Sequence, residues 1–166
     1  MQHFLILSDT HGNTARLTRV LDMHKDATAV LFLGDGLDEV HTLASRMPLY
    51  AVRGNCDYGA ADEDELLVKI GRHRALLLHG HTAGAKSGED GLIARARARG
   101  ADIVLYGHTH LRSERYLTPE EGGPLWIFNP GSLGFPYGSA PSFGTLTVDG
   151  KGNLLFGHGA LEEDIL

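Results

Sequence analysis

Residues 4–12 read FLILSDTHG, and the fold class can be inferred by working outward from them. The continuous apolar run Phe4–Leu7 predicts a strand that is buried on both faces. It ends in a polar turn that contains Asp9, His11 and a glycine. Because side chains two positions apart in extended backbone can point the same way, the turn presents a carboxylate and an imidazole together.

The same arrangement recurs four more times along the chain: a short run rich in Val, Leu and Ile ends in a polar turn with glycine. The runs and turns are Ala29–Leu33 with Gly34-Asp35-Gly36, Leu49–Val52 with Arg53-Gly54-Asn55-Cys56-Asp57, Ala75–Leu78 with His79-Gly80-His81, and Ile103–Tyr106 with Gly107-His108-Thr109-His110. Sites in open α/β sheets form beyond the carboxyl ends of the strands, so we expect these groups to converge. We expect the glycines at 34, 54 and 107 to let the backbone turn sharply there.

Helical patterns separate several of these strands. Asn13 is suited to cap a helix that carries apolar residues at spacings of three and four, and two further helices are expected over Glu39–Met47, before Pro48, and Glu89–Arg99, before Gly100. Strand–helix alternation predicts an α/β fold with βαβ units and a largely parallel sheet.

The pattern changes from about Arg112 onward. Strands are expected at Leu125–Phe128, Thr145–Val148 and Leu154–Phe156 without clear helices between them, and residues 149–152 have the composition of a hairpin turn. We therefore expect an antiparallel portion packed beside the parallel one.

The composition is that of one globular domain over residues 1–166. A net charge of -6 argues against strong nucleic-acid binding, which relies on clustered Lys and Arg. The single cysteine, Cys56, excludes an internal disulfide framework. No signal peptide or membrane span is recognisable, so we expect a cytoplasmic protein with no membrane partner.

The strand-end turns contain a set of side chains typical of metal ligands. Oxygen ligands mixed with imidazole suit Mn²⁺, Fe²⁺ or Zn²⁺ better than Ca²⁺, and the lack of thiolates argues against a structural zinc site. The carboxylate of Asp35 could bridge two ions through its two oxygens. The seven candidate ligands are Asp9, His11, Asp35, Asn55, His79, His108 and His110.

Taken in order, these turns resemble the five motifs of the calcineurin-like metallophosphoesterases. The form Gly54-Asn55-Cys56-Asp57 and the later Asn129-Pro130-Gly131-Ser132 resemble in particular the small YfcE-type phosphodiesterase group. The resemblance covers roughly residues 4–135. It implies a four-layer α/β/β/α sandwich of two mixed sheets flanked by helices.

The resemblance also implies how the metals are held. One ion would bind Asp9, His11 and His110, a second would bind Asn55, His79 and His108, and Asp35 would bridge them. Asn55 is then also a catalytic residue. Two divalent ions are implied, with Mn²⁺ the first choice and Ni²⁺, Co²⁺, Zn²⁺ or Fe²⁺ as alternatives.

The implied activity is metal-dependent hydrolysis of a small phosphate ester by a metal-bridging hydroxide. Many relatives have a histidine where this chain has Cys56; it is thought to protonate the leaving oxygen and to be oriented by an aspartate corresponding to Asp38. A thiol is a poorer proton donor, so a phosphodiesterase is favoured over a phosphomonoesterase. A non-catalytic scaffold, like the retromer subunit that shares this fold, is the other alternative. Similar proteins often form homo-oligomers.

Two further residues are candidates for substrate binding: Arg53 could clamp a phosphate, and His81 lies beside a proposed ligand. The stretch 80–87 nearly matches a phosphate-binding Walker A loop, but Ala85 replaces its required glycine, so we interpret the glycines at 84, 88 and 91 as marking a flexible loop beside the site. A cysteine phosphatase would need arginine where Asp62 stands, and no Gly-x-Ser-x-Gly elbow occurs. Residues 60–65 are expected to form an acidic, solvated loop.

Overall fold

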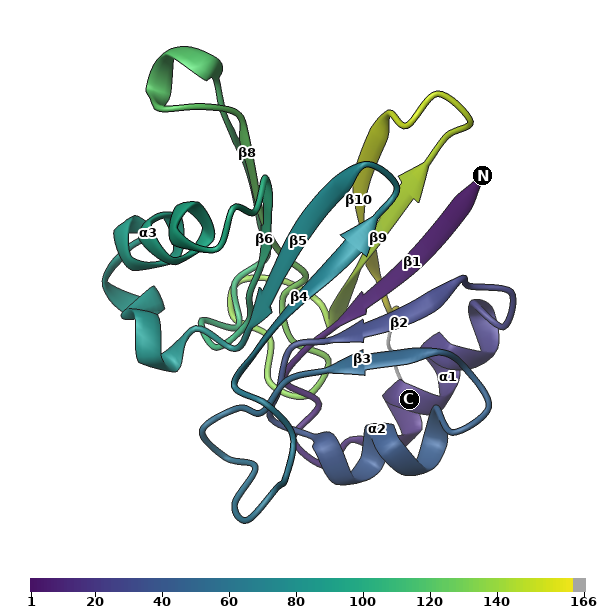
Figure 1. Ribbon diagram of the computed structural model, residues 1–166. Coiled ribbons are helices and arrows are strands. Elements are labelled where there is room, and N and C mark those ends of the chain that lie inside the picture. Colours follow the sequence, from purple (N-terminus) through teal and green to yellow (C-terminus); the bar gives the residue numbers. More distant parts are fainter. Residues whose placement is uncertain (163–166) are drawn as a thin grey trace.

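The computed structural model describes residues 1–162, which contain two mixed sheets of five strands each (Figure 1). The first sheet has the order β10-β9-β1-β2-β3 and the second the order β4-β5-β6-β8-β7. The first comprises β1 (Gln2–Leu7), β2 (Ala29–Phe32), β3 (Leu49–Ala51), β9 (Ser142–Val148) and β10 (Leu154–Ala160). The second comprises β4 (Glu65–Ile70), β5 (His73–Leu78), β6 (Ile103–Leu105), β7 (Ser113–Leu117) and β8 (Leu125–Asn129).

Three adjacent strands run parallel in each sheet: β1, β2 and β3 at one side of the first, and β5, β6 and β8 in the middle of the second. The pairs β1·β2, β2·β3, β5·β6 and β6·β8 are parallel, whereas β9, β10, β4 and β7 join antiparallel. The expected antiparallel portion beside the parallel one is correct for β9 and β10, a hairpin turning at residues 149–152 as expected, which extends the first sheet. It is wrong for β8, which pairs parallel with β6 in the second sheet. The strands after residue 112 pair with strands of the two sheets, and this pairing satisfies their backbone hydrogen-bonding groups.

Three helices among the described residues cover the two outer faces: α1 (Thr14–Met23) and α2 (Leu37–Leu43) lie on the first sheet, and α3 (Asp90–Ala98) lies on the second (Figure 1). Side chains alternate accordingly along the strands. Ile6 of β1 packs between the sheets, whereas its neighbours Leu5 and Leu7 pack against α1 and α2. Leu76 of β5 likewise faces α3. The four-layer α/β/β/α sandwich is thus confirmed.

The helix boundaries show what local sequence can and cannot specify. Asn13 caps α1 as expected, since its side chain accepts a hydrogen bond from the Arg16 N–H at 3.1 Å. α2 instead begins two residues before the expected Glu39 and ends at Leu43 rather than Met47. Its early start has a remote cause: Asp57 Oδ1 accepts the N–H groups of Gly36 and Leu37 at 2.9 and 3.0 Å, which satisfies the helix N-terminus.

The strand-end glycines act differently from one another. Gly34 adopts φ of 100°, as a sharp turn requires. Gly54 and Gly107 do not have positive φ. A Cβ at Gly54 would collide with the Asp35 side chain, and one at Gly107 would collide with Ser8, so these two glycines permit close approach rather than a turn. No helix within residues 1–162 has the length and apolar character that a membrane crossing requires.

Candidate metal centre

Buried polar side chains meet where β1, β2, β5 and β6 end. Asp9 is fully buried at the end of β1. Its Oδ1 atom lies 3.2 Å from His110 Nε2, 3.5 Å from His11 Nε2 and 3.8 Å from His79 Nε2. No hydrogen-bond donor satisfies this Oδ1 atom within residues 1–162. Three imidazoles thus face one unsatisfied carboxylate oxygen.

The second carboxylate, Asp35, stands beside the first. Its Oδ2 atom lies 3.2 Å from His79 Nε2 and 3.8 Å from His11 Nε2. Its Oδ1 atom accepts the backbone N–H of Cys56 at 2.7 Å. Asp35 therefore connects the end of β2 with the turn after β3, and it faces imidazoles from two directions.

Backbone carbonyls orient two of the imidazoles. His79 Nδ1 donates to Leu33 O at 2.6 Å, and His110 Nδ1 donates to Phe135 O at 2.6 Å. Each ring consequently presents Nε2 to the carboxylates. The Nε2 atom of His79 is buried and has no hydrogen-bond partner in the described part of the chain. Second partners of this kind fix the tautomer of histidines that bind metals.

The backbone at the cluster is unusual. Within residues 1–162, the non-glycine residues with positive φ are Asp9, His11, Asp35, His108 and His110, at 44–69°. All belong to the ligand set inferred from the sequence. Asp and His tolerate this left-handed conformation better than most residues, but it still costs energy. The strand-end turns therefore hold these side chains in conformations that local sequence preference alone would not select.

The charges of the cluster are strongly coupled. Burial acts to raise the pKa of Asp9, but attraction to the adjacent imidazoles of His11 and His110 outweighs it and holds that pKa well below its usual range. For Asp35, attraction to the adjacent His79 imidazole outweighs the effect of burial and lowers the pKa. The adjacent Asp9 carboxylate raises the pKa of His110, and the adjacent Asp35 carboxylate raises that of His79 although burial opposes it. The ionised carboxylates of Asp9 and Asp35 therefore face imidazole nitrogens that carry a proton or can bind a metal ion in its place.

His108 and Asn55 lie at the margin of the cluster. The His108 ring packs against that of His79 with centroids 5.0 Å apart, and its backbone N–H donates to Asp9 Oδ2 at 3.0 Å. Burial, and then the charge of His79, lowers the pKa of His108 to about 4, which leaves it neutral near pH 7, the form that binds metals. Asn55 is exposed, and its Nδ2 donates to Cys56 Sγ at 3.5 Å.

The two substrate-binding candidates differ in position. The His81 ring lies 5.4 Å from the His79 ring and 6.1 Å from that of His108, and its buried Nδ1 has no hydrogen-bond partner within residues 1–162. Arg53 is outside the cluster, where its Nε and Nη2 donate to Asp64 Oδ1 at 3.1 and 2.9 Å.

The segment 60–65, expected to be a solvated acidic loop, is not simply solvated. Three of its four acidic side chains have partners: Asp64 binds Arg53, Asp62 Oδ2 lies 2.8 Å from His41 Nε2, and Glu65 pairs with arginines of α3 and its C-terminal end, while Glu63 is exposed. Glu65 is also the first residue of β4. Ion pairing to neighbouring elements, which the local composition does not encode, therefore anchors this segment.

Sequence reasoning missed several supporting residues. Asp57 Oδ2 accepts the N–H groups of Asp35 and Gly54 at 2.7 and 2.8 Å, in addition to the two bonds that begin α2. Glu39 Oε1 accepts the Thr10 hydroxyl at 2.5 Å and the Gly12 N–H at 2.8 Å. Asp57 stands two residues after the proposed ligand Asn55, which could have marked it as a supporting residue. Its hydrogen-bond partners follow only from the three-dimensional structure.

A second layer of support comes from the segment after β8. Ser132 Oγ donates to Asp9 O at 2.8 Å. Asn129 Nδ2 donates to Gly107 O and to Thr109 Oγ1 at 3.1 and 3.0 Å. The stretch 129–132, noticed in the sequence only through resemblance, thus ties the turns at Asp9 and His108 together.

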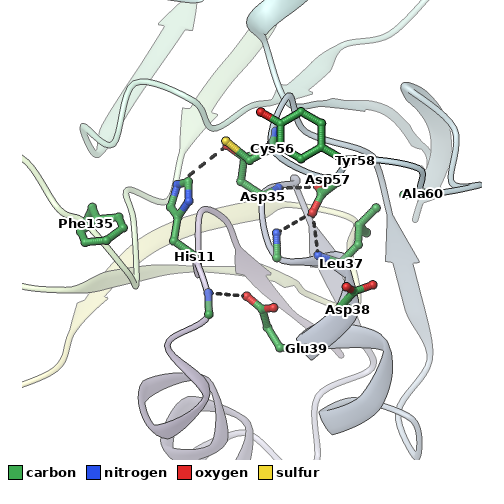
Figure 2. A pocket seen from close by; sticks show the side chains of 12 residues that line it. His11, Asp35, Leu37, Asp38, Glu39, Cys56, Asp57, Tyr58, Ala60 and Phe135 are labelled. Carbon is green, nitrogen blue, oxygen red and sulfur yellow. Dashed lines mark hydrogen bonds and ion pairs between the residues drawn. The ribbon is translucent and has the colours of Figure 1, made fainter.

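A cleft of about 440 Å³ opens onto the cluster (Figure 2). His11 and Asp35 reach its floor, Phe135 stands on one side, and Cys56 and Tyr58 stand on another. Asp38 and Glu39, from the first turn of α2, also line it. A small ester could therefore reach the cluster from solvent.

The cluster fits divalent metal ions on its own chemistry. Asp9, His11 and His110 bring ligand atoms within 4.8 Å of one another, as do Asp9, Asp35 and His79. The first of these groups matches the ligands inferred for one ion. Buried atoms without partners, Asp9 Oδ1 and His79 Nε2, are what a cation would satisfy. The site therefore has the composition and geometry of a divalent metal centre.

Fold and site together define a family. Residues 1–151 match the family described as "Calcineurin-like phosphoesterase superfamily domain", and the chain belongs to this superfamily.

Two relatives within this superfamily are similar to the chain over most of their length. The chain is 36% identical to "Probable metallophosphoesterase YsnB" of Bacillus subtilis over 133 residues, covering 80% of this chain and 75% of the relative. It is 30% identical to "Phosphodiesterase YfcE" of Escherichia coli K12, covering 90% of this chain and 89% of the relative. The resemblance drawn from the motifs is thereby confirmed.

The fold also occurs in a protein whose name does not describe it as a phosphoesterase. The structure of Vps29 from Entamoeba histolytica, complexed with Zn²⁺, aligns with a TM-score of 0.71 and 22% identity over 95% of this chain and 98% of that one. At this identity the likeness concerns the fold alone.

Proposed function

We propose that this protein is a phosphodiesterase that uses two divalent metal ions, with Mn²⁺ the first candidate. Asp9, His11 and His110 would hold one ion, Asn55, His79 and His108 the other, and Asp35 would bridge them. Bound ions of this kind supply a water of lowered pKa as nucleophile and polarise the phosphoryl oxygens. The names of the relatives YsnB and YfcE support this class of reaction.

One observation carries the proposal. The buried Oδ1 atom of Asp9 has three imidazole nitrogens within 3.8 Å and no hydrogen-bond donor in the described residues. A carboxylate buried only for stability would have its oxygens satisfied by hydrogen bonds, because leaving one unsatisfied costs free energy. A site prepared for a cation explains this arrangement.

The protein residues contribute position and charge. Leu33 O and Phe135 O hold His79 and His110 with Nε2 facing the carboxylates. His108 is neutral near pH 7 because of its lowered pKa. His81, half-buried beside His79 and His108, is the nearer of the two substrate-binding candidates to the cluster. Arg53 would contact substrate only after releasing Asp64, so we assign it the smaller part.

Cys56 supports the preference for diesters. Its thiol lies on the cleft beside Asp35, and burial, followed by the charge of Asp35, raises its pKa. A thiol with a raised pKa gives up its proton reluctantly and protonates a leaving alkoxide poorly. Esters with good leaving groups, or substrates that bring their own proton donor, are therefore preferred.

The direct test is hydrolysis of bis(p-nitrophenyl) phosphate by protein loaded with Mn²⁺, Ni²⁺, Co²⁺ or Zn²⁺. We expect activity that a chelator abolishes and that Asp35→Asn removes. Asp22→Asn, at an exposed carboxylate of α1, is the matched control and should keep full activity. Absence of hydrolysis at full metal loading with every one of these ions would overturn the proposal and favour a scaffold.

A further inference from the structure

A second depression, separate from the cleft of Figure 2, is lined in part by Tyr137, whose ring stacks on His110. We call it the Tyr137 groove. It has a volume of about 520 Å³. Its lining residues are Ala85, Lys86, Gly88, Glu89, Tyr106, Thr109, Leu111, Ser113 and Tyr137. Because Tyr137 stacks on His110, the groove borders the candidate metal centre.

An exposed aromatic face forms one wall of the groove. The Tyr137 ring stacks on that of His110, with centroids 5.1 Å apart and planes inclined by 29°. Its backbone N–H donates to His110 O at 3.1 Å, which fixes the segment, yet the side chain stays 58% exposed. Leu111 is 51% exposed beside it. Large apolar surfaces held open next to a reactive centre are typical of ligand contacts.

The groove also carries a cation. Lys86 lines it and lies in the 3-10 turn Ala85–Ser87, within the stretch that nearly matches a Walker A loop. Its ammonium group has no ion pair within residues 1–162. The other charge of the groove, Glu89, is neutralised by Arg115, whose Nη1 lies 2.8 Å from Glu89 Oε2. The groove therefore carries a net positive charge.

The cleft of Figure 2 has the opposite character. Asp38 and Glu39 line it together with Asp35 and Asp57, and no Lys or Arg does. The two sides of the metal centre thus differ in charge, which orients a substrate with two unlike arms.

We propose that the Tyr137 groove binds one esterified alcohol of the phosphodiester, and that this alcohol carries a flat aromatic ring system, as a nucleoside does. The ring stacks on Tyr137 against Leu111, and Lys86 contacts the phosphate. Stacking of a base on an aromatic side chain adds affinity that is tolerant of base identity. This inference rests on the proposed function and names its substrate class.

The test compares two phosphates that differ only by a base. Binding of adenosine 5′-phosphate and of ribose 5-phosphate to the Mn²⁺-loaded protein is measured by calorimetry. We expect adenosine 5′-phosphate to bind about tenfold more tightly. Tyr137→Ala should remove this difference and Tyr137→Phe should keep it, whereas Lys86→Met should weaken both ligands.

Matched controls isolate the groove. Tyr116→Ala replaces an exposed tyrosine of β7, and Lys151→Met replaces an exposed lysine of the β9–β10 turn. Neither substitution should change the affinity for either phosphate. Because Tyr137 rests on His110, metal content is determined for every variant. Leu111→Ala, which leaves that stacking intact, should lower the preference for adenosine 5′-phosphate in the same direction as Tyr137→Ala.

The possible outcomes separate the two proposals. Equal binding of the two phosphates by the native protein, or a preference unchanged in Tyr137→Ala and Leu111→Ala, would overturn the groove inference while hydrolysis of bis(p-nitrophenyl) phosphate stands. Loss of that hydrolysis at full metal loading would overturn the proposed function, and the binding comparison would still report on the groove.

Discussion

His110 Nε2 lies 3.2 Å from Asp9 Oδ1, although the two residues are 101 positions apart and come from different sheets. Phe135 O binds the other nitrogen of the ring, and Ser8 Oγ and the His108 N–H bind the other oxygen of the carboxylate, at 2.5 and 3.0 Å. Hydrogen bonds to their other polar atoms therefore hold both side chains in place with Nε2 and Oδ1 facing each other. A cation can bind between them with little rearrangement of the protein.

Asp9→Asn should remove one of the two proposed ions. The amide cannot supply the negative charge that holds a divalent cation beside His11 and His110, so we expect bound metal to fall from two ions to one per chain. We expect kcat/KM for bis(p-nitrophenyl) phosphate to fall at least about a hundredfold. Elemental analysis of the purified variant and its kinetics check this, with Asp22→Asn as the control. Unchanged metal content would show that Asp9 is not a ligand.

Metal affinity should fall as pH falls. The pKa values of His79 and His110 are raised, so in the metal-free protein both take up protons at a higher pH than an ordinary histidine does. A metal must displace those protons from Nε2, so acid competes with metal. We expect affinity for Mn²⁺ to drop at least about tenfold per pH unit below pH 7, with protons released on binding.

Calorimetry at pH 6 and pH 8, in buffers of different ionisation enthalpy, measures both quantities. A metal affinity that is the same at the two pH values would contradict the assignment of these two histidines as ligands.

Asp57→Ala should destabilise the fold even without metal. The Asp57 carboxylate accepts N–H groups of Asp35, Gly36, Leu37 and Gly54, and its loss leaves the start of α2 and the turn at Asp35 without acceptors. We expect the free energy of unfolding to fall by about 2–4 kcal/mol. Urea unfolding of chelator-treated protein measures it, and Asp26→Ala, at an exposed site, should change it little. An equal effect of both substitutions would show that the four hydrogen bonds of Asp57 do not contribute to the free energy of unfolding.

Cys56→His should restore a proton donor. Cys56 and Asp38 line the same cleft, so an imidazole at 56 stands near a carboxylate that can orient it. General acid catalysis contributes roughly a hundredfold or more, so we expect at least about a tenfold rise in p-nitrophenyl phosphate hydrolysis relative to the diester. Adding Asp38→Asn should cancel part of the gain. A native protein that already prefers monoesters would refute the argument from the missing histidine.

Much of the site could be predicted because it follows from strand ends. An apolar run followed by a glycine-containing polar turn specifies both a buried strand and the edge at which its side chains emerge, so the pattern of residues alone predicts that Asp9, Asp35 and His79 lie together. The late strands could not be assigned to sheets, because a strand such as β9 pairs with whichever edge is open, and that is decided by the whole fold.

Supporting residues escaped prediction for a related reason. Asp57 binds backbone N–H groups that lie 20 or more positions away in the chain, and no local pattern records such partners. β7 escaped because most of its side chains are exposed at a sheet edge and show no apolar alternation. Asn55 remains a ligand by prediction; in this structure it is exposed and its amide donates to Cys56 Sγ.

The left-handed backbone at five of the ligand positions bears on the history of the chain. At about 1 kcal/mol for each non-glycine residue, these five conformations together cost roughly as much as the lower end of the net stability of a small domain. Glycine would relieve the strain at every one of them. Selection for folding alone would therefore erode the metal centre first, and a descendant freed from catalysis should become more stable as it loses its ligands. In this chain all five positions are Asp or His, so the strained turns coincide with the candidate ligands.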